Sequence, residues 1–329
     1  MYNVSREQVA ATIPGSEKLP NSTDLSNFPH KFMDVPYANG SSAQRLNLVL
    51  PNVGEAPFPL VVYIHGGGWL IGDKNHVQTK NVYRLLYAGY AVCCIDYRLS
   101  DEAKWPENLY DCKAAIRFLR ANAEKFQISP GRIGVVGNSA GGHLAAMLGT
   151  TNGKPEFEDL SMGNGDFSSD VQAVFTWFAP YDFVNWVEDF KKAYPGRPLD
   201  YEVSAEAYMF GHSLLEHPER LEAASPICQL DQNTVPFYVE YGTGDHAIPH
   251  AQCPRFYERY VQLLGEDNIQ IRAFEGAEHS APVYAEDGNV FEFVRFFDRY
   301  IRQTEPRPYF QLGTLGEYDS RLDLAGAGT

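Results

Sequence analysis

The residue best placed for nucleophilic chemistry is Ser139, at the centre of a Gly-x-Ser-x-Gly motif. Gly137 and Gly141 occupy the fixed positions on either side of it. A β-branched apolar run, 133–136, precedes the motif, and residues 144–148 favour a helix. This context predicts a strand that turns sharply into a helix and exposes the serine at the turn. The alternative is that small residues only let a strand and a helix pack closely.

A serine hydroxyl needs a base to act as a nucleophile at neutral pH. His279 is the predicted base, and Asp245 is predicted to hold the imidazole tautomer and stabilise the imidazolium. Each follows the end of a predicted strand. The alternatives are a turn residue for Asp245 and a surface histidine for His279. Glu240, which lies inside a strand, and Asp287, which follows the histidine, are the rival acids.

Three consecutive glycines lie in the segment His65-Gly-Gly-Gly-Trp69. Such a run has a high cost in backbone entropy, so it fits a place where backbone N–H groups approach another group closely. We therefore expect the N–H groups of Gly67, Gly68 and Ala140 to bind an oxyanion. His65 is expected to brace this loop, and a flexible loop is the alternative.

These residues need a scaffold that brings them together. Apolar runs predict strands at 59–64, 90–95, 133–136, 171–178, 236–241 and 269–274, and helical patterns lie at 75–88, 108–126, 251–264 and 290–301. This alternation predicts an α/β protein with a mostly parallel sheet covered by helices on both faces. A hairpin of strands, 31–37 and 45–50, precedes it. The carboxyl ends of parallel strands share one edge, where the candidate residues would meet.

The predicted domain organisation has one catalytic domain with additions. Residues 1–30 are expected to form an N-terminal arm or lid, 31–302 the catalytic domain, and 303–329 a C-terminal tail. Within the domain, about 182–218 is expected to form a cap. An ordinary helical excursion with its own small core is the alternative. The predicted substrate-binding residues are Trp69, Trp186 and Tyr208.

Composition excludes several classes of partner. The chain has 329 residues and a net charge of -15, which argues against nucleic acid and anionic membranes. Five cysteines without C-x-x-C spacing predict buried free thiols in a reducing compartment. We expect no metal, no cofactor and a small-molecule substrate; the oligomeric state is open. The absence of a signal peptide predicts a cytoplasmic protein, with a trimmed secreted form as the alternative.

The motifs also carry a family resemblance. The segments 65–69, 137–141, 242–245 and 276–279 resemble those of α/β-hydrolase esterases related to hormone-sensitive lipase, in the branch with bacterial feruloyl and acetyl-xylan esterases. The resemblance covers about residues 32–301. It implies an α/β-hydrolase fold and a serine carboxylesterase acting on short-chain or aromatic acyl esters, of acetyl or feruloyl type, from plant carbohydrates. The alternatives are an arylformamidase or amidase and a non-catalytic binding module.

Overall fold

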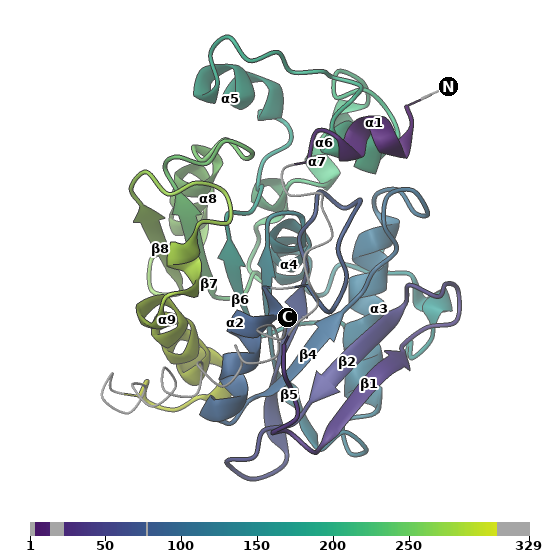
Figure 1. Cartoon of the computed structure of the whole chain (residues 1–329), viewed down its shortest axis with the longest axis vertical. Helices are drawn as coiled ribbons and strands as arrows, with labels where there is room; N and C mark the ends of the chain where they lie inside the picture. Colours follow the sequence, from purple (N-terminus) through teal and green to yellow (C-terminus); the bar gives the residue numbers. More distant parts are fainter. Residues whose placement is uncertain (1–3, 14–22, 77, 308–329) are drawn as a thin grey trace, which may run out of the picture.

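A computed structural model describes residues 4–13, 23–76 and 78–307. Its described part is built on an eight-stranded sheet with the strand order β1-β2-β4-β3-β5-β6-β7-β8 (Figure 1). The strands are β1 Lys31–Pro36, β2 Arg45–Val49, β3 Phe58–Ile64, β4 Ala91–Ile95, β5 Ile128–Asn138, β6 Ala173–Trp177, β7 Phe237–Gly242 and β8 Ile269–Phe274. The β1–β2 and β2–β4 pairs are antiparallel, and the remaining pairs are parallel. The predicted mostly parallel sheet is therefore confirmed.

The central strands are apolar because both faces of the sheet are covered. Every residue of β3 is buried. Because successive side chains of a strand point to opposite faces, Leu60, Val62 and Ile64 belong to one hydrophobic cluster, and Val61 and Tyr63 belong to another. This explains why β3 is a continuous apolar run rather than an alternating pattern.

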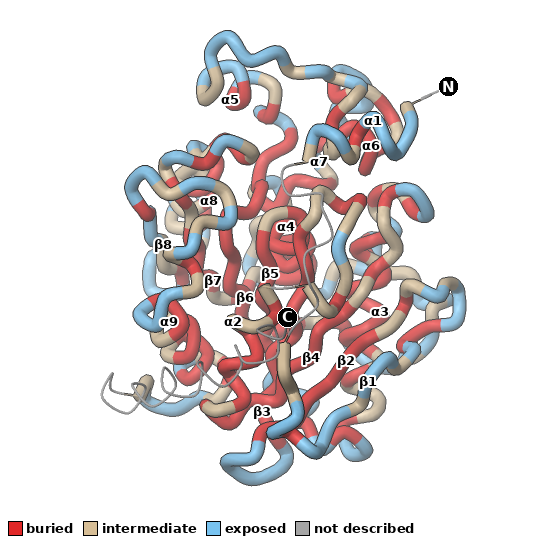
Figure 2. Tube along the Cα trace, viewed as in Figure 1, coloured by how far each residue is buried: buried red, intermediate tan, exposed pale blue. Residues whose placement is uncertain are grey.

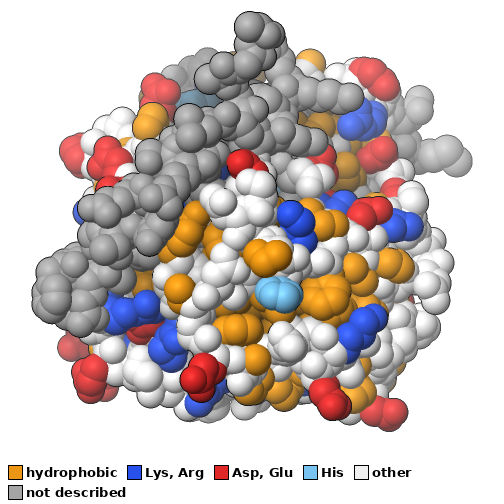
Figure 3. All heavy atoms as spheres, turned by 60° about the horizontal axis from the view of Figure 1, so that its bottom comes forward, with side chains coloured by type: hydrophobic (Ala, Val, Ile, Leu, Met, Phe, Trp, Pro, Cys, Tyr) orange, Lys and Arg blue, Asp and Glu red, His pale blue; other side chains and the backbone are white. Residues whose placement is uncertain are grey.

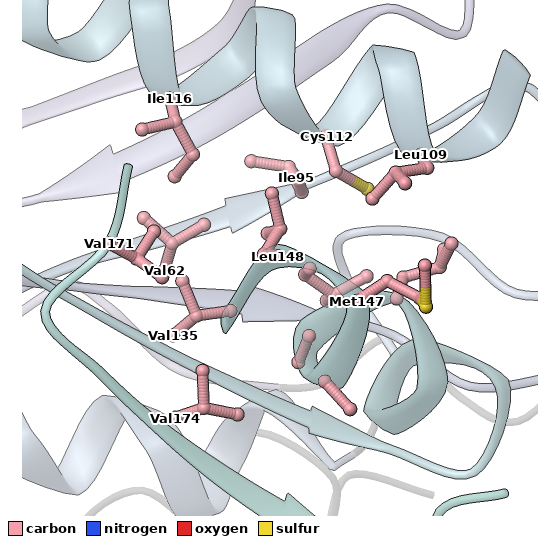
Figure 4. Close-up of a cluster of buried hydrophobic side chains, with 14 of the residues drawn as sticks. Val62, Ile95, Leu109, Cys112, Ile116, Val135, Met147, Leu148, Val171 and Val174 are labelled. Carbon is pink, nitrogen blue, oxygen red and sulfur yellow. The ribbon is translucent and has the colours of Figure 1, made fainter. Parts of the chain in front are cut away.

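Helices pack on both faces of the sheet. The longer ones are α3 Glu107–Ala121, α4 Ala140–Thr150, α8 Gln252–Leu264 and α9 Asp287–Phe297. Figure 4 shows the first cluster, in which Val62 and Val135 of the sheet face Leu109 and Ile116 of α3. The second cluster contains α9 and the 3-10 helix η1, Arg84–Ala88. Burying one such aliphatic side chain contributes about 1.5–3 kcal/mol.

Some element boundaries differ from the predictions. The helix expected at 75–88 begins later, as α2 Thr79–Tyr83, and continues as η1. The delay has a local cause, because the Asp73 carboxylate accepts a hydrogen bond from the Asn75 N–H at 2.7 Å and holds a turn. Gly89 ends the helix as expected, with a left-handed φ of 81°. The helix expected at 290–301 begins at Asp287 and finishes in a π-helical turn, Asp298–Arg302.

Short helices lie together at one end of the molecule (Figure 1). The predicted cap contains α5 Trp186–Ala193 and α6 Ala205–Phe210, and α7 Pro218–Ala223 follows it. The N-terminal arm contributes α1 Arg6–Ala10, whose Val9 is fully buried against Leu70 and Tyr208. Residues 14–22 of the expected arm and 308–329 of the expected tail lie outside the described residues.

The central strands of the sheet are buried, and exposed residues lie towards the outside of the molecule (Figure 2). On the face in Figure 3, hydrophobic side chains gather around a histidine among acidic and basic groups. Cys93, Cys94, Cys112 and Cys253 are buried and free, as predicted; Cys228 is free but exposed, because it lies on a surface 3-10 turn. Within the described ranges, no helix is long and apolar enough to cross a membrane.

Candidate active site

Ser139 lies at the junction between β5 and α4, which confirms the predicted strand–turn–helix. Its backbone has φ 51° and ψ -124°, a conformation that costs on the order of 1–3 kcal/mol and is found at functional sites. The turn is possible because its flanks lack side chains. A Cβ on Gly141 would lie only 2.1 Å from the Ile64 carbonyl oxygen. The Ser139 N–H donates to Trp177 O at 3.0 Å, which fixes the turn against β6.

A chain of hydrogen bonds joins the three predicted catalytic side chains. Ser139 Oγ lies 3.0 Å from His279 Nε2, and His279 Nδ1 lies 2.8 Å from Asp245 Oδ2. A carboxylate beside Nδ1 holds the proton on that nitrogen and leaves Nε2 as an acceptor. The serine hydroxyl can therefore donate its proton to Nε2.

Backbone hydrogen bonds fix the side chain of Asp245, and an aromatic ring contacts the side chain of His279. Asp245 is buried, and its Oδ1 accepts hydrogen bonds from the N–H groups of Ala247 at 2.8 Å and Ile248 at 2.9 Å. The ring of His279 is contacted edge to face by Phe178, with 4.5 Å between centroids. Both side chains come from loops that follow parallel strands, β7 for Asp245 and β8 for His279, so they reach the same edge of the sheet as Ser139.

The glycine loop lies against the nucleophile. A Cβ on Gly66 would be 3.2 Å from Ser139 Cβ. Gly67 has a φ of 112°, and a Cβ there would be 2.2 Å from the Ile71 carbonyl oxygen, so only glycine fits. Within the described residues, the N–H groups of Gly67 and Gly68 donate to no acceptor, and Ala140 begins α4, where the N–H has no intrahelical acceptor. The three predicted oxyanion donors are thus unpaired.

His65 braces the glycine loop, as expected. Its Nδ1–H donates to Gly66 O at 2.8 Å, and its ring stacks on Tyr97 with 4.6 Å between centroids. Tyr97 also donates from its hydroxyl to the His65 carbonyl oxygen at 3.1 Å. Burial lowers the pKa of His65, so the ring stays neutral.

Asn138 is a site residue that sequence reasoning missed. Its Oδ1 accepts hydrogen bonds from the Tyr63 hydroxyl at 2.7 Å and from the Gly66 N–H at 3.2 Å. One amide oxygen therefore ties the glycine loop to the turn that carries Ser139. Its only signal in the sequence is its place in the variable position of the serine motif.

A cavity of about 1140 Å³ opens above Ser139 and His279. Gly67 and Gly68 line it, and so do residues of the predicted cap between 186 and 206 and residues of the N-terminal arm. Its charged and polar lining residues include Arg6, Asp73, His76, Arg197, Asp200, Glu206 and His246. These residues could not be predicted from the sequence, because they lie in loops and short helices that carry no motif.

The predicted substrate-binding residues differ in their positions. Tyr208 does not line the cavity, contrary to the prediction, because its ring packs against Val9 beneath α1 with Lys104 Nζ 3.5 Å from the ring centroid. Trp69 and Trp186 are both lining residues, but each is only 1 % exposed. The Trp69 Nε1–H donates to His143 at 3.2 Å, so this ring supports the site from the core.

The predicted cap is hydrogen-bonded to the loop that carries Asp245. The Tyr194 hydroxyl donates to Asp245 O at 2.9 Å, and Arg197 Nη1 donates to His246 O at 2.5 Å. The Arg197 guanidinium also lies over the rings of Phe190 and Tyr194, at 5.3 and 5.5 Å from their centroids.

Known proteins resemble this chain in sequence and in fold. The family model described as BD-FAE matches residues 46–260. Esterase LipC of Mycobacterium tuberculosis is 32% identical over 223 residues, 68% of this chain and 53% of that protein. A solved truncated form of a carbohydrate esterase from gut microbiota is 26% identical with a TM-score of 0.74, covering 84% of this chain and 98% of the other. A solved structure of a bifunctional GH43-CE of Bacteroides eggerthii is 29% identical with a TM-score of 0.72. The match covers 86% of this chain and 36% of the other.

These similarities show the α/β-hydrolase fold that the motifs predict. The chain spans about half to three-fifths of the length of the first curated relatives it matches.

Proposed function

The chain belongs to the BD-FAE family, and we propose that it is a serine carboxylesterase in which Ser139 is the nucleophile, His279 the base and Asp245 the orienting acid. The observation that supports this most strongly is the hydrogen-bonded chain from Asp245 through His279 to Ser139 Oγ. That chain lies beneath a cavity large enough for a small-molecule ester. The names of the relatives, an esterase and a carbohydrate esterase, point to the same reaction.

The reaction follows from the placement of these groups. Ser139 Oγ attacks the ester carbonyl carbon while its proton passes to His279 Nε2. The N–H groups of Gly67, Gly68 and Ala140 bind the oxyanion that forms, and one such donor typically contributes 10²–10³-fold in kcat. The His279 imidazolium then protonates the leaving alcohol. Water, deprotonated by the same histidine, releases the acid and restores the serine.

The proposed substrates are short-chain or aromatic acyl esters, of acetyl or feruloyl type, on plant-derived carbohydrates. The polar and charged groups around the cavity suit hydroxyl-rich alcohols, and the net charge of -15 suits a neutral ester. We further propose that residues 31–302 form the catalytic domain. In this proposal, the N-terminal arm and the 182–218 segment together form the cap.

The test is to replace the nucleophile. Ser139→Ala should reduce kcat for acetyl and feruloyl methyl esters by on the order of 10⁴-fold or more and abolish labelling by a fluorophosphonate probe. Ser26→Ala, which changes an exposed serine far along the sequence from the motif, is the matched control and should leave both readouts unchanged. A Ser139→Ala protein that keeps a tenth of the wild-type rate would refute the assignment.

A further inference from the structure

A second, smaller cavity adjoins the site and has no part in the function described so far. Its volume is about 220 Å³, and its lining includes Trp177, Phe178 and Tyr284. We call it the side cavity. Gln78, Asn138 and Ser280 line both cavities, so they form the wall between them.

Six of the eleven residues that line the side cavity are aromatic or aliphatic, and the other five are polar: Gln78, Lys80, Asn81, Asn138 and Ser280. The three aromatic residues that line it are buried, and Ala281, Pro282 and Ala285 complete that part of its surface. A dry protein cavity of about 150 Å³ holds one benzene ring. The side cavity therefore has room for a ring with a few additional atoms or for a short alkyl chain. A feruloyl group, a ring with a methoxy, a hydroxyl and a propenoyl substituent, exceeds it.

Phe178, Tyr284 and Asn138 form a rigid part of its wall. Phe178 has a φ of 39°, which is a strained conformation for a bulky residue, and its N–H donates to Glu240 O at 2.7 Å. The ring of Phe178 lies between His279 and Tyr284, with centroids 4.5 and 4.7 Å away. Asn138 is fixed by its two hydrogen bonds. The side cavity thus keeps its shape directly beside the catalytic histidine.

Gln78 is the weakly held part of the wall. Its Nε2 donates to Ser280 Oγ at 3.3 Å, a long hydrogen bond. Its Oε1 is buried, and no residue of the described ranges donates to it. A buried amide oxygen without a donor is unfavourable, so rotation of this side chain breaks one long bond and lets the oxygen reach water or substrate. That rotation would join the side cavity to the large cavity.

We propose that the side cavity is a subsite of the ester site, opened by Gln78, that takes one compact apolar substituent of the substrate. This inference rests on the proposed esterase function and names the size of the group that the enzyme accepts. The substituent is either the acyl group or the alcohol group, because both leave the carbonyl carbon within reach of the shared wall. Groups as large as feruloyl must occupy the large cavity.

Two variants change the side cavity in opposite directions. Ala285→Phe fills it from the end of the 3-10 helix Pro282–Ala285, away from the catalytic side chains. Gln78→Ala removes the proposed gate. The matched control is Ala121→Phe, which adds the same ring to a partly exposed alanine at the end of α3, outside both cavities.

The assay measures kcat/KM on two series of esters. Methyl acetate, butyrate, benzoate and ferulate vary the acyl group, and methyl, butyl and benzyl acetate vary the alcohol group. Ala285→Phe should lower the rate on methyl benzoate, or on benzyl acetate, at least tenfold relative to methyl acetate. Gln78→Ala should raise the same ratio. The kcat/KM for methyl ferulate should change less than twofold in Ala285→Phe. A change in the acyl series shows that the acyl group enters the side cavity, and a change in the alcohol series shows that the alcohol group enters it.

The proposal is overturned if both ratios stay within twofold of wild type in both variants while methyl acetate is still hydrolysed. If Ala285→Phe does not fold, as judged by its melting curve, unchanged ratios in Gln78→Ala alone overturn it. A failure of the esterase assignment looks different, because the wild-type protein would then neither hydrolyse methyl acetate nor react with the fluorophosphonate probe.

Discussion

Glu240 places a carboxyl group inside the central sheet, and its pKa makes stability depend on pH. The side chain is fully buried on β7. Trp177 Nε1 donates to its Oε2 at 3.0 Å, whereas Oε1 is buried without a partner in the described part of the chain. Burial raises the pKa of Glu240 from 4.5 to about 8, although the charge of Arg272 lowers it; the charge of Glu292 raises it.

The sign of the effect follows from proton binding. Between pH 4.5 and about 8 the folded protein keeps a proton on Glu240 that the unfolded chain has lost. The free energy of unfolding is therefore highest below the unfolded pKa of 4.5. It decreases as the pH rises from there through the folded pKa of about 8. Each pH unit in this window lowers the free energy of unfolding by about 1.4 kcal/mol. The upper limit of this loss is roughly 3 kcal/mol at pH 7 and roughly 5 kcal/mol above pH 8.

Glu240→Gln should remove this dependence. Glutamine does not titrate, has nearly the same shape and keeps an oxygen to accept the Trp177 hydrogen bond. The free energy of unfolding, measured by denaturant titration at pH 5, 7 and 9, should show a variant that is more stable than wild type, with the smallest gain at pH 5. Glu275→Gln, at an exposed carboxylate past the end of β8, is the control and should show no such trend. A stability difference that does not change with pH would refute the reasoning.

Three other predictions concern the site and its cap. Asn138→Ala should lower kcat for methyl acetate by about 10- to 100-fold, because the Gly66 N–H and Tyr63 hydroxyl lose their shared acceptor; steady-state kinetics and a melting curve check this. The ratio kcat/KM should fall as the pH is lowered from about 9 to 5, because a protonated His279 cannot accept the serine proton; a flat profile would contradict a histidine base. Val9→Asp should release α1 from Leu70 and raise KM for bulky esters more than for methyl acetate, and equal effects on both would exclude α1 as a wall of the substrate site.

Both the sheet and the convergence of the three candidate catalytic residues could be predicted from the sequence, because both follow from the properties of buried parallel strands. Strands buried on both faces must be apolar along their whole length, so β3 and β4 stand out from the surrounding sequence. Parallel strands then bring their carboxyl ends to one edge, which places Ser139, Asp245 and His279 together without any information on side-chain packing.

The lining of the cavity could not be predicted in this way. An irregular segment shows no periodic pattern of apolar residues. The sequence therefore does not tell whether an aromatic ring in it faces the core or the ligand. Trp69 has a φ of 57°, and this turn directs its ring towards His143. Tyr208 is covered by Val9, and one apolar residue in a polar arm gives no pattern. The side cavity depends on Gln78 meeting Ser280, 202 positions later in the chain.

The hydrogen bonds between the cap and the Asp245 loop have an evolutionary consequence. Tyr194 and Arg197 donate to the backbone carbonyl oxygens of Asp245 and His246, not to their side chains. A main-chain acceptor is the same whichever amino acid occupies the position. Lineages can therefore exchange the residue at 246, or replace the inner surface of the cap around these two anchors, without dislodging the cap. Substitutions in the walls of the cavity therefore need not disturb the hydrogen-bonded chain of Ser139, His279 and Asp245.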